Sequence, residues 1–124
     1  MNTNKPVIYI ASPYTGSDYE RTKRFKDVEK YAAHIIQQGV TAMSPIVHNH
    51  TLAARHQLPR EFDFWQEYCL SLLNVCDELY VLMLDGWDES VGVKAEIALA
   101  RELITPVRFI DAETYEEVDN PGDV

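Results

Sequence analysis

The stretch from residue 78 to residue 103 constrains the fold more than any other part of the 124-residue chain. It begins with the apolar run Leu79 to Leu84, in which polar and apolar residues do not alternate. That pattern is typical of a strand covered by helices on both faces, as in a parallel sheet. Gly86 ends the run, and either Asp88 or Ser90 is placed to cap a following helix. This helix is expected to bury an apolar stripe made of Val93, Ile97, Ala100 and Ile104.

Glu96 is a charged residue beside the apolar stripe of this helix. At about 100° per residue it projects roughly 60° from the centre of the stripe, whereas Lys94 and Arg101 fall on the solvated side. A carboxylate at the border of a core can simply extend to solvent or pair with a neighbouring donor. Its position also suggests a function, because open α/β sheets bind ligands just beyond the carboxyl ends of their strands. The free amides and dipole of the helix N-terminus favour ionisation, so Glu96 is expected to be an anion at neutral pH.

Strands and helices alternate along the rest of the chain. Strands are expected at 7–11, 41–44 and 106–110, and helices at 18–38 and 61–75. Residues 45–60 show no clear period and are expected to form a long loop, which often signals function. The alternation predicts a single doubly wound α/β domain, Rossmann-like or flavodoxin-like, over residues 1–111, with a parallel sheet of four or five strands. Residues 112–124 are expected to be an acidic, frayed tail.

Length and composition narrow the function classes. The chain is long enough for one core and too short for two. A net charge of −9 argues against binding nucleic-acid polymers, so a nucleotide-like ligand would have to be small. The two cysteines, Cys69 and Cys76, fit small apolar residues of a reducing compartment. The sequence has no recognisable signal peptide and no apolar run of membrane-spanning length, which predicts a cytoplasmic protein without a membrane partner.

Two loops are expected to meet at one edge of the sheet, because the first and central strands are predicted neighbours at a topological switch point. They are residues 12–17 and residues 85–90. The first loop lacks the glycine spacing of a dinucleotide fingerprint or a Walker loop, so no nicotinamide or other cofactor and no ATP hydrolysis is expected. It offers the hydroxyls of Ser12, Tyr14 and Thr15, which suit a phosphate or a sugar hydroxyl. Taken alone, this loop is explained better by turn formation and helix capping than by ligand binding.

Five segments of the chain carry a more specific pattern. They are Tyr9-Ile-Ala-Ser-Pro-Tyr-Thr15, Ser44-Pro-Ile-Val-His48-Asn-His50, Phe64-Trp65, Cys76-Asp-Glu-Leu-Tyr-Val-Leu82 and Gly86-Trp87-x-x-Ser90-x-Gly92-x-x-x-Glu96. Together they resemble a phage and bacterial family of unknown function that belongs with the nucleoside 2-deoxyribosyltransferases and nucleotide N-glycosidases. The resemblance extends to about Asp111, and its most specific part is the element from Ser90 to Glu96.

The resemblance implies roles for the matching residues. The glutamate that matches Glu96 is a nucleophile, which attacks the anomeric carbon of a ribosyl or deoxyribosyl group and displaces the base. The covalent glycosyl-enzyme then passes its sugar to water or to another base. The serine matching Ser90 binds a sugar phosphate or hydroxyl, Gly92 belongs to the same binding element, and residues matching Ser12 and Tyr14 line the pocket. The relatives form dimers or larger oligomers, which implies a homo-oligomer here.

The chain departs from these relatives at Cys69, eight residues before Asp77. The relatives commonly carry an aspartate there, which orients the substrate or supports proton transfer to the leaving base. A neutral thiol is a weak hydrogen-bond donor and a poor acid near neutral pH. Two functions therefore stay open. One is an enzyme that cleaves or exchanges the N-glycosidic bond of a nucleoside or nucleotide, and the other is a non-catalytic domain that binds or senses nucleotides.

Further candidates lie in the loop before Ser90. Asp85, the second catalytic candidate, and Asp88 can donate a proton or bind ribose hydroxyls, although aspartates beside glycine also simply form loops. Trp87 and Tyr14 can stack on a base.

The histidines give a last set of candidates. His48 and His50 are expected on the same side of an extended segment, where both can contact a phosphate or a base. A zinc site of His48, His50, His56 and Cys69 would lack any known ligand spacing, so no metal site is predicted. Trp65 lies on an apolar stripe and is predicted to belong to the core.

Overall fold

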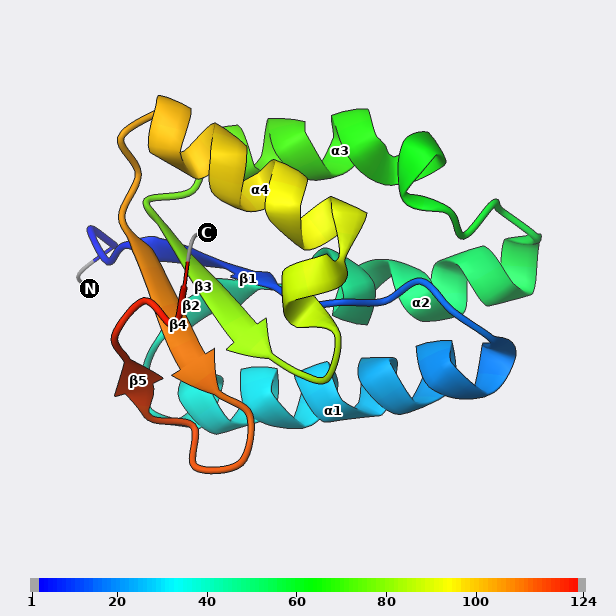
Figure 1. Cartoon of the computed structure of the whole chain (residues 1–124), viewed down its shortest axis with the longest axis horizontal. Helices are drawn as coiled ribbons and strands as arrows, with labels where there is room; N and C mark the ends of the chain where they lie inside the picture. The colour runs from blue at the N-terminus through cyan, green and yellow to red at the C-terminus, as the bar shows by residue number, and fades with distance from the viewer. Residues whose placement is uncertain (1–2, 123–124) are drawn as a thin grey trace.

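A five-stranded sheet forms the centre of the structure, a computed structural model in which residues 3–122 are described (Figure 1). Its strands are β1 (Val7–Ala11), β2 (Thr41–Met43), β3 (Glu78–Met83), β4 (Val107–Asp111) and β5 (Glu117–Val118). The sheet order is β2-β1-β3-β4-β5, and all pairs are parallel except β4 with β5. The predicted doubly wound, Rossmann-like α/β fold is confirmed.

The switch point lies between β1 and β3. β1 pairs with β2 on one side and with β3 on the other, and Tyr9 stands opposite Leu79. After β1 the chain passes through α1 to β2, and after β3 it passes through α4 to β4 on the other side of the sheet order. These connections diverge, which leaves a crevice at the carboxyl ends of β1 and β3. The loops after β1 and β3 therefore start at the same edge of the sheet, as the sequence predicted.

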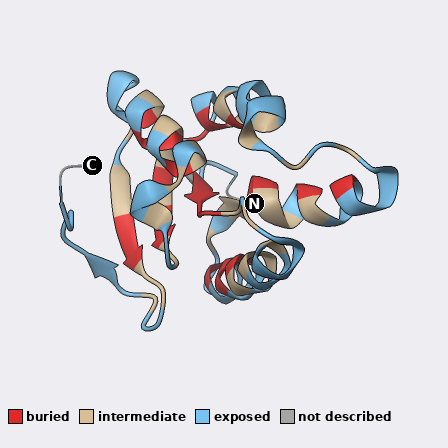
Figure 2. Cartoon of the chain, turned by 45° about the vertical axis from the view of Figure 1, so that its right-hand side comes forward, coloured by how far each residue is buried: buried red, intermediate tan, exposed pale blue. Residues whose placement is uncertain are grey.

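Four α-helices surround the sheet within residues 3–122. They are α1 (Asp18–Gln37), α2 (Pro45–His56), α3 (Phe62–Asn74) and α4 (Val91–Glu102). α3 and α4 pack on one face against Tyr9, Leu79 and Val81, whereas α1 packs on the other face against Ile10 and Leu82. Figure 2 shows the buried residues on the strands and on the inward sides of the helices. Because both faces are covered, β3 needs apolar residues at successive positions.

Helix ends follow local capping signals. Ser17 caps α1, since its Oγ accepts from the amide of Glu20 at 3.2 Å and its own amide donates to the Glu20 carboxylate at 3.0 Å. Gly39, two residues beyond the end of this helix, has a φ of 91°, a conformation that favours glycine. No helix in residues 3–122 is long and apolar enough to cross a membrane.

The segment 45–60, predicted to be a loop, is mostly helix. α2 begins at Pro45, and Ser44 caps it by accepting from the amide of Val47 at 3.2 Å. Serine followed by proline is a known start signal, because proline occupies a position whose amide would be unpaired anyway. The residues facing inward recur at helical spacing: Pro45, Ile46, Asn49, His50 and Ala53. The prediction was wrong because Asn49 and His50 are polar and interrupt the apolar period.

α4 ends earlier than its apolar pattern predicted. The helix stops at Glu102, and Ile104 is 88 % exposed rather than buried, with a left-handed φ of 57°. Thr105 precedes Pro106, and a residue before proline disfavours the helical conformation. The chain therefore turns, and the amide of Thr105 donates to the carbonyl of Ala100 at 2.8 Å, as in a Schellman motif.

The predicted acidic tail is ordered as far as residue 118. Glu117 and Val118 pair with Ile110 and Phe109 on the outer edge of β4. The ring of Tyr115 lies edge-on to Tyr31 with a centroid distance of 5.0 Å, which anchors the turn before β5. The expectation of fraying was therefore wrong for this part of the tail.

Replacing Ile104 with glycine is expected to raise the free energy of unfolding by about 1 kcal/mol. A β-branched side chain at positive φ is strained by about 1–2 kcal/mol, and the greater freedom of glycine in the unfolded chain offsets part of this gain. Urea unfolding measures the change. Ile36→Gly, at an exposed position inside α1, is the control and should destabilise the protein by about the same amount. Equal destabilisation by both variants would contradict strain at Ile104.

Candidate active site

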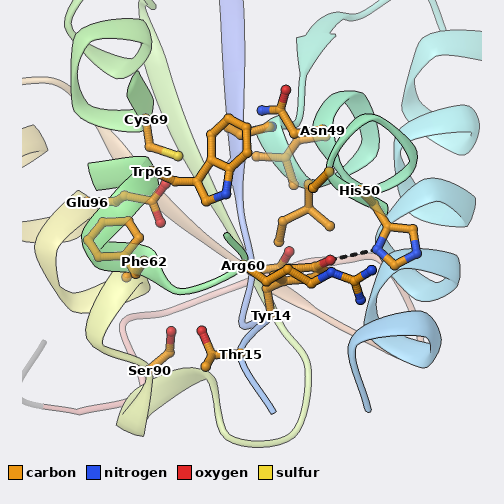
Figure 3. A pocket seen from close by; sticks show the side chains of 16 residues that line it. Tyr14, Thr15, Asn49, His50, Arg60, Phe62, Trp65, Cys69, Ser90 and Glu96 are labelled. Atoms are coloured by element: carbon orange, nitrogen blue, oxygen red, sulfur yellow. Dashed lines mark hydrogen bonds between the residues drawn. The ribbon is translucent and has the colours of Figure 1, made fainter. Parts of the chain in front are cut away.

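A cavity of about 680 Å³, its open mouth included, lies beyond the carboxyl ends of β1 and β3 (Figure 3). The loop after β1, one face of α2, the start of α3 with the segment before it, and the first turns of α4 form its walls. The side chains that can make hydrogen bonds are Ser12, Tyr14, Thr15, Asn49, His50, Arg60, Trp65, Cys69, Ser90 and Glu96.

Glu96 lies in the cavity wall and is almost fully enclosed, with 6 % exposure. Tyr9, which is completely buried on β1, donates a hydrogen bond from its hydroxyl to Oε2 of Glu96. Burial and the neighbouring Glu96 both raise the pKa of Tyr9, so its hydroxyl remains a donor. This bond joins the first strand to the helix after the central strand and fixes the orientation of the carboxyl group.

The protonation of Glu96 differs from the prediction. Burial raises the pKa of Glu96 from its ordinary 4.5 to about 8, and the hydrogen bond from Tyr9 opposes this only in part. The favourable effect of a helix N-terminus is confined to the first turn, whereas Glu96 is six residues beyond the cap Ser90. Loss of water around the carboxyl group therefore outweighs the helix dipole. The carboxyl group is mostly neutral at pH 7.

Cys69 reaches the same wall from α3, beside Glu96 (Figure 3). Its thiol also interacts with the hydroxyl of Tyr9. Cys69 is 8 % exposed, and burial together with the nearby Glu96 raises its pKa to about 11. The thiol is thus neutral at physiological pH. It cannot donate a proton as a carboxylic acid would.

A second pair of titratable groups lies in the cavity. The hydroxyl of Tyr14 and Nδ1 of His50 are 2.6 Å apart. The imidazole of His50 is stacked on Phe25 of α1, with a centroid distance of 4.3 Å, so its plane is fixed. Burial, then the guanidinium groups of Arg60 and Arg21, lower the pKa of His50.

Two polar side chains in the cavity have no protein partner. Ser12 and Asn49 are each 6 % exposed, and neither the hydroxyl of Ser12 nor the amide of Asn49 forms a hydrogen bond within the described residues. Buried polar groups are almost always paired, and an unpaired one costs about 1–3 kcal/mol. Both groups are therefore available to a ligand.

Ser90, Gly92 and Phe62 shape the opposite side of the cavity. Ser90, one of two predicted caps, is the one that caps α4: its Oγ accepts from the amide of Val93 at 3.2 Å. Its own hydroxyl proton remains free to meet a ligand. A Cβ at position 92 would lie only 3.0 Å from the ring of Phe62, so glycine there allows Phe62 to pack over the first turn of α4.

The structure places four of the predicted site residues outside the cavity. His48 is exposed because α2 is a helix, and its successive histidines do not share a side as they would in an extended segment. Asp85 and Asp88 are exposed in the turn and the short 3-10 helix η1 (Trp87–Glu89). Trp87 packs on Phe109 instead, with a centroid distance of 5.7 Å.

Several cavity residues were not predicted. Asn49 lies on the inward face of α2 beside His50, which the sequence offered only as part of an extended segment, and Arg60 and Phe62 lie at the start of α3. Trp65, predicted to be core, forms part of the wall, and its indole N–H donates to the carbonyl of Pro59 at 2.7 Å. The helical spacing of the α2 residues was the sequence signal that could have revealed them.

Metal ligands do not gather in the described part of the chain. Within residues 3–122, no group of three or more His, Cys, Asp or Glu side chains is arranged to hold a metal ion. His48, His50, His56 and Cys69 in particular do not come together.

The buried carboxyl group predicts a specific pH dependence of stability. Because the pKa of Glu96 is raised in the folded state, burying the neutral carboxyl group contributes fully to the stability of the protein below pH 4.5. This contribution to the free energy of unfolding is lost as the pH rises to about 8. Glu96→Gln should remove this loss, which is at most about 5 kcal/mol. Thermal unfolding at acidic and mildly alkaline pH measures the difference. The control variant Glu102→Gln, exposed on the same helix, should show the same pH dependence of stability as the unaltered protein. The same pH dependence in Glu96→Gln would contradict the raised pKa of Glu96.

Comparison with known proteins places the chain in a family. A family model described as "Domain of unknown function (DUF1937)" matches residues 6–112. A solved structure of a 2-deoxyribosyltransferase from Bacillus psychrosaccharolyticus is similar over 92 % of this chain and 77 % of that chain, with a TM-score of 0.55 and 23 % identity. This likeness concerns the fold, and no curated protein matches the chain. Since the family model spans most of its length, the chain belongs to the DUF1937 family.

Proposed function

We propose that the protein cleaves or exchanges the N-glycosidic bond of a small nucleoside or nucleotide, with Glu96 as the nucleophile. The observation that carries the proposal is the buried carboxyl group of Glu96, held by Tyr9 in the wall of the open cavity at the switch point of the sheet. The fold shared with a 2-deoxyribosyltransferase supports the same chemistry. A carboxylate in such a position can form a covalent intermediate with a sugar.

The orientation of Glu96 suits this role. Tyr9 holds Oε2, which leaves Oε1 to attack the anomeric carbon. Because the pKa of Glu96 is raised to about 8, a minor fraction of the molecules has an ionised Glu96 at pH 7, and this reactive fraction exists without a general base. The bond between Oε1 and the anomeric carbon forms as the bond to the base breaks. Water or a second base then attacks the same carbon and releases Glu96.

Other cavity residues would bind the substrate. The free hydroxyl of Ser12 and those of Thr15 and Ser90 suit sugar hydroxyls or a sugar phosphate. The rings of Phe62 and Trp65 give flat apolar walls for the sugar and the base. No residue role in this scheme calls for a cofactor.

A second candidate function is binding without turnover. It is favoured by the neutral state of Glu96 at pH 7 and by the neutral thiol of Cys69, where the relatives have an aspartate. A neutral carboxyl group donates a hydrogen bond, which suits a nucleotide receptor as well as an enzyme. The two functions differ in whether free base is released.

Incubation with a panel of deoxynucleosides and their 5′-monophosphates, followed by chromatography for free base, tests the proposal. Release of a base is expected, and Glu96→Gln should lower it by about 1000-fold or more, because an amide cannot act as the nucleophile. Glu102→Gln should release base at the unaltered rate. Mass spectrometry should detect the glycosyl adduct on the peptide that contains Glu96.

Two results would contradict an enzyme of this kind. Equal release by Glu96→Gln would remove Glu96 as the nucleophile. Binding of a panel member, detected by calorimetry, without any release of base would leave the receptor function in its place.

A further inference from the structure

We propose that the Tyr14 hydroxyl is the catalytic acid that protonates the departing base, and that His50 behind it supplies the proton. The inference rests on the proposed function and adds the second half of its chemistry. A base that leaves a sugar takes the electron pair of the broken bond, and without a proton it is a poor leaving group. The cavity must therefore contain a proton donor in addition to the nucleophile.

Few residues of the cavity can serve as that donor. Glu96 is the only carboxyl group among the lining residues, and it is engaged as the nucleophile. Burial raises the pKa of both the Cys69 thiol and the Tyr14 hydroxyl, so neither is by itself an acid near neutrality, and Arg60 does not release a proton in proteins. Serine and threonine hydroxyls are weaker acids still. His50 is the remaining lining residue with an ordinary pKa near neutrality, 6.5.

The geometry joins His50 to the cavity through Tyr14. The 2.6 Å contact between the Tyr14 hydroxyl and Nδ1 of His50 is short enough for proton transfer. Stacking on Phe25 prevents the imidazole from turning away. Figure 3 shows Glu96 on one side of the cavity and the Tyr14–His50 pair on the other. A ligand between them can present its anomeric carbon to Glu96 and its base to Tyr14.

The charges around His50 favour release of its proton. Tyr14 faces it from the loop after β1, Arg21 from α1, and Arg60 from the segment before α3. Asp18 pairs with both arginines, at 2.7 Å and 3.3 Å, but is exposed to solvent. Burial and the two guanidinium groups lower the pKa of His50, so its protonated form is a stronger acid than an ordinary imidazolium.

The step balances in protons and charge. Oε1 of ionised Glu96 bonds to the anomeric carbon, and the electron pair of the carbon–nitrogen bond passes to the base. Tyr14 gives its hydroxyl proton to the base and takes the Nδ1 proton of protonated His50. A carboxylate and an imidazolium become an ester and a neutral imidazole, and the base leaves neutral. When water cleaves the ester, its proton returns to His50 through Tyr14.

Dependence on the leaving group tests the proposal. The preferred deoxynucleoside of the panel is compared with 4-nitrophenyl 2-deoxyriboside, whose leaving group departs as an anion and needs no proton. Tyr14→Phe should lower kcat for the nucleoside on the order of 100-fold, with the nitrophenyl substrate nearly unaffected. His50→Asn should act in the same direction, because an amide can still bond to Tyr14 but cannot supply a proton.

Matched controls separate this role from damage to the fold. Tyr19→Phe and His48→Asn make the same changes at exposed positions and should leave both substrates unaffected. Equal losses on both substrates in Tyr14→Phe would overturn the proposal, since a residue that only shapes the cavity acts on both alike. Undiminished release from the nucleoside would overturn it as well.

Two further outcomes locate a failure. Cys69→Asp restores a second carboxyl group beside Glu96, with Cys69→Ser as its control; a rise in nucleoside turnover confined to Cys69→Asp would show that Tyr14 is not the working acid. If the nitrophenyl substrate is cleaved and Glu96→Gln abolishes its cleavage, Glu96 is supported as the nucleophile, even if the results for Tyr14→Phe contradict Tyr14 as the acid. If the unaltered protein cleaves neither substrate, the proposed function fails, and the acid fails with it.

Discussion

The hydrogen bond between Tyr9 and Glu96 is the contact on which the site depends. A carboxyl group with 6 % exposure would be very unfavourable without a donor, and Tyr9 supplies one from the completely buried face of β1. The bond connects the first strand to the helix that follows the central strand. These elements are far apart in sequence, so the site exists only once the parallel sheet has formed. The Tyr9–Glu96 pair therefore makes the geometry of the candidate site depend on formation of the sheet.

The sequence predicted the central strands β1 and β3 well because they are largely buried and therefore continuously apolar, whereas the exposed edge strand β5 was not predicted. It failed at α2 for a related reason. The inward face of that helix lines a cavity rather than the core, and a cavity for a polar ligand calls for residues such as Asn49 and His50. The polar residues that line the cavity therefore interrupt the apolar period by which α2 could have been predicted. Ile104 shows the opposite error, since the apolar period continued past the point where Pro106 forces a turn.

Much of the candidate site could also be predicted. Ser12, Tyr14, Ser90, Gly92 and Glu96 are fixed by the end of one strand or the start of one helix, and the structure brings them to a single cavity or its rim. The sequence could not predict where the side chains of Asp85, Trp87 and Asp88 point, because a turn and a short 3-10 helix determine their directions. The protonation of Glu96 was mispredicted, because it depends on how completely α3, α4 and β1 exclude water.

The unpaired groups of Ser12 and Asn49 have a consequence for the protein as a whole. A fold that buries hydrogen-bonding groups without partners is less stable when empty than its packing alone would allow. A ligand that satisfies both completes the interior, so occupancy and folding become linked equilibria. Cellular concentrations of such a ligand would then influence how long each molecule survives unfolding and proteolysis. The abundance of the protein would follow the supply of the compound it binds.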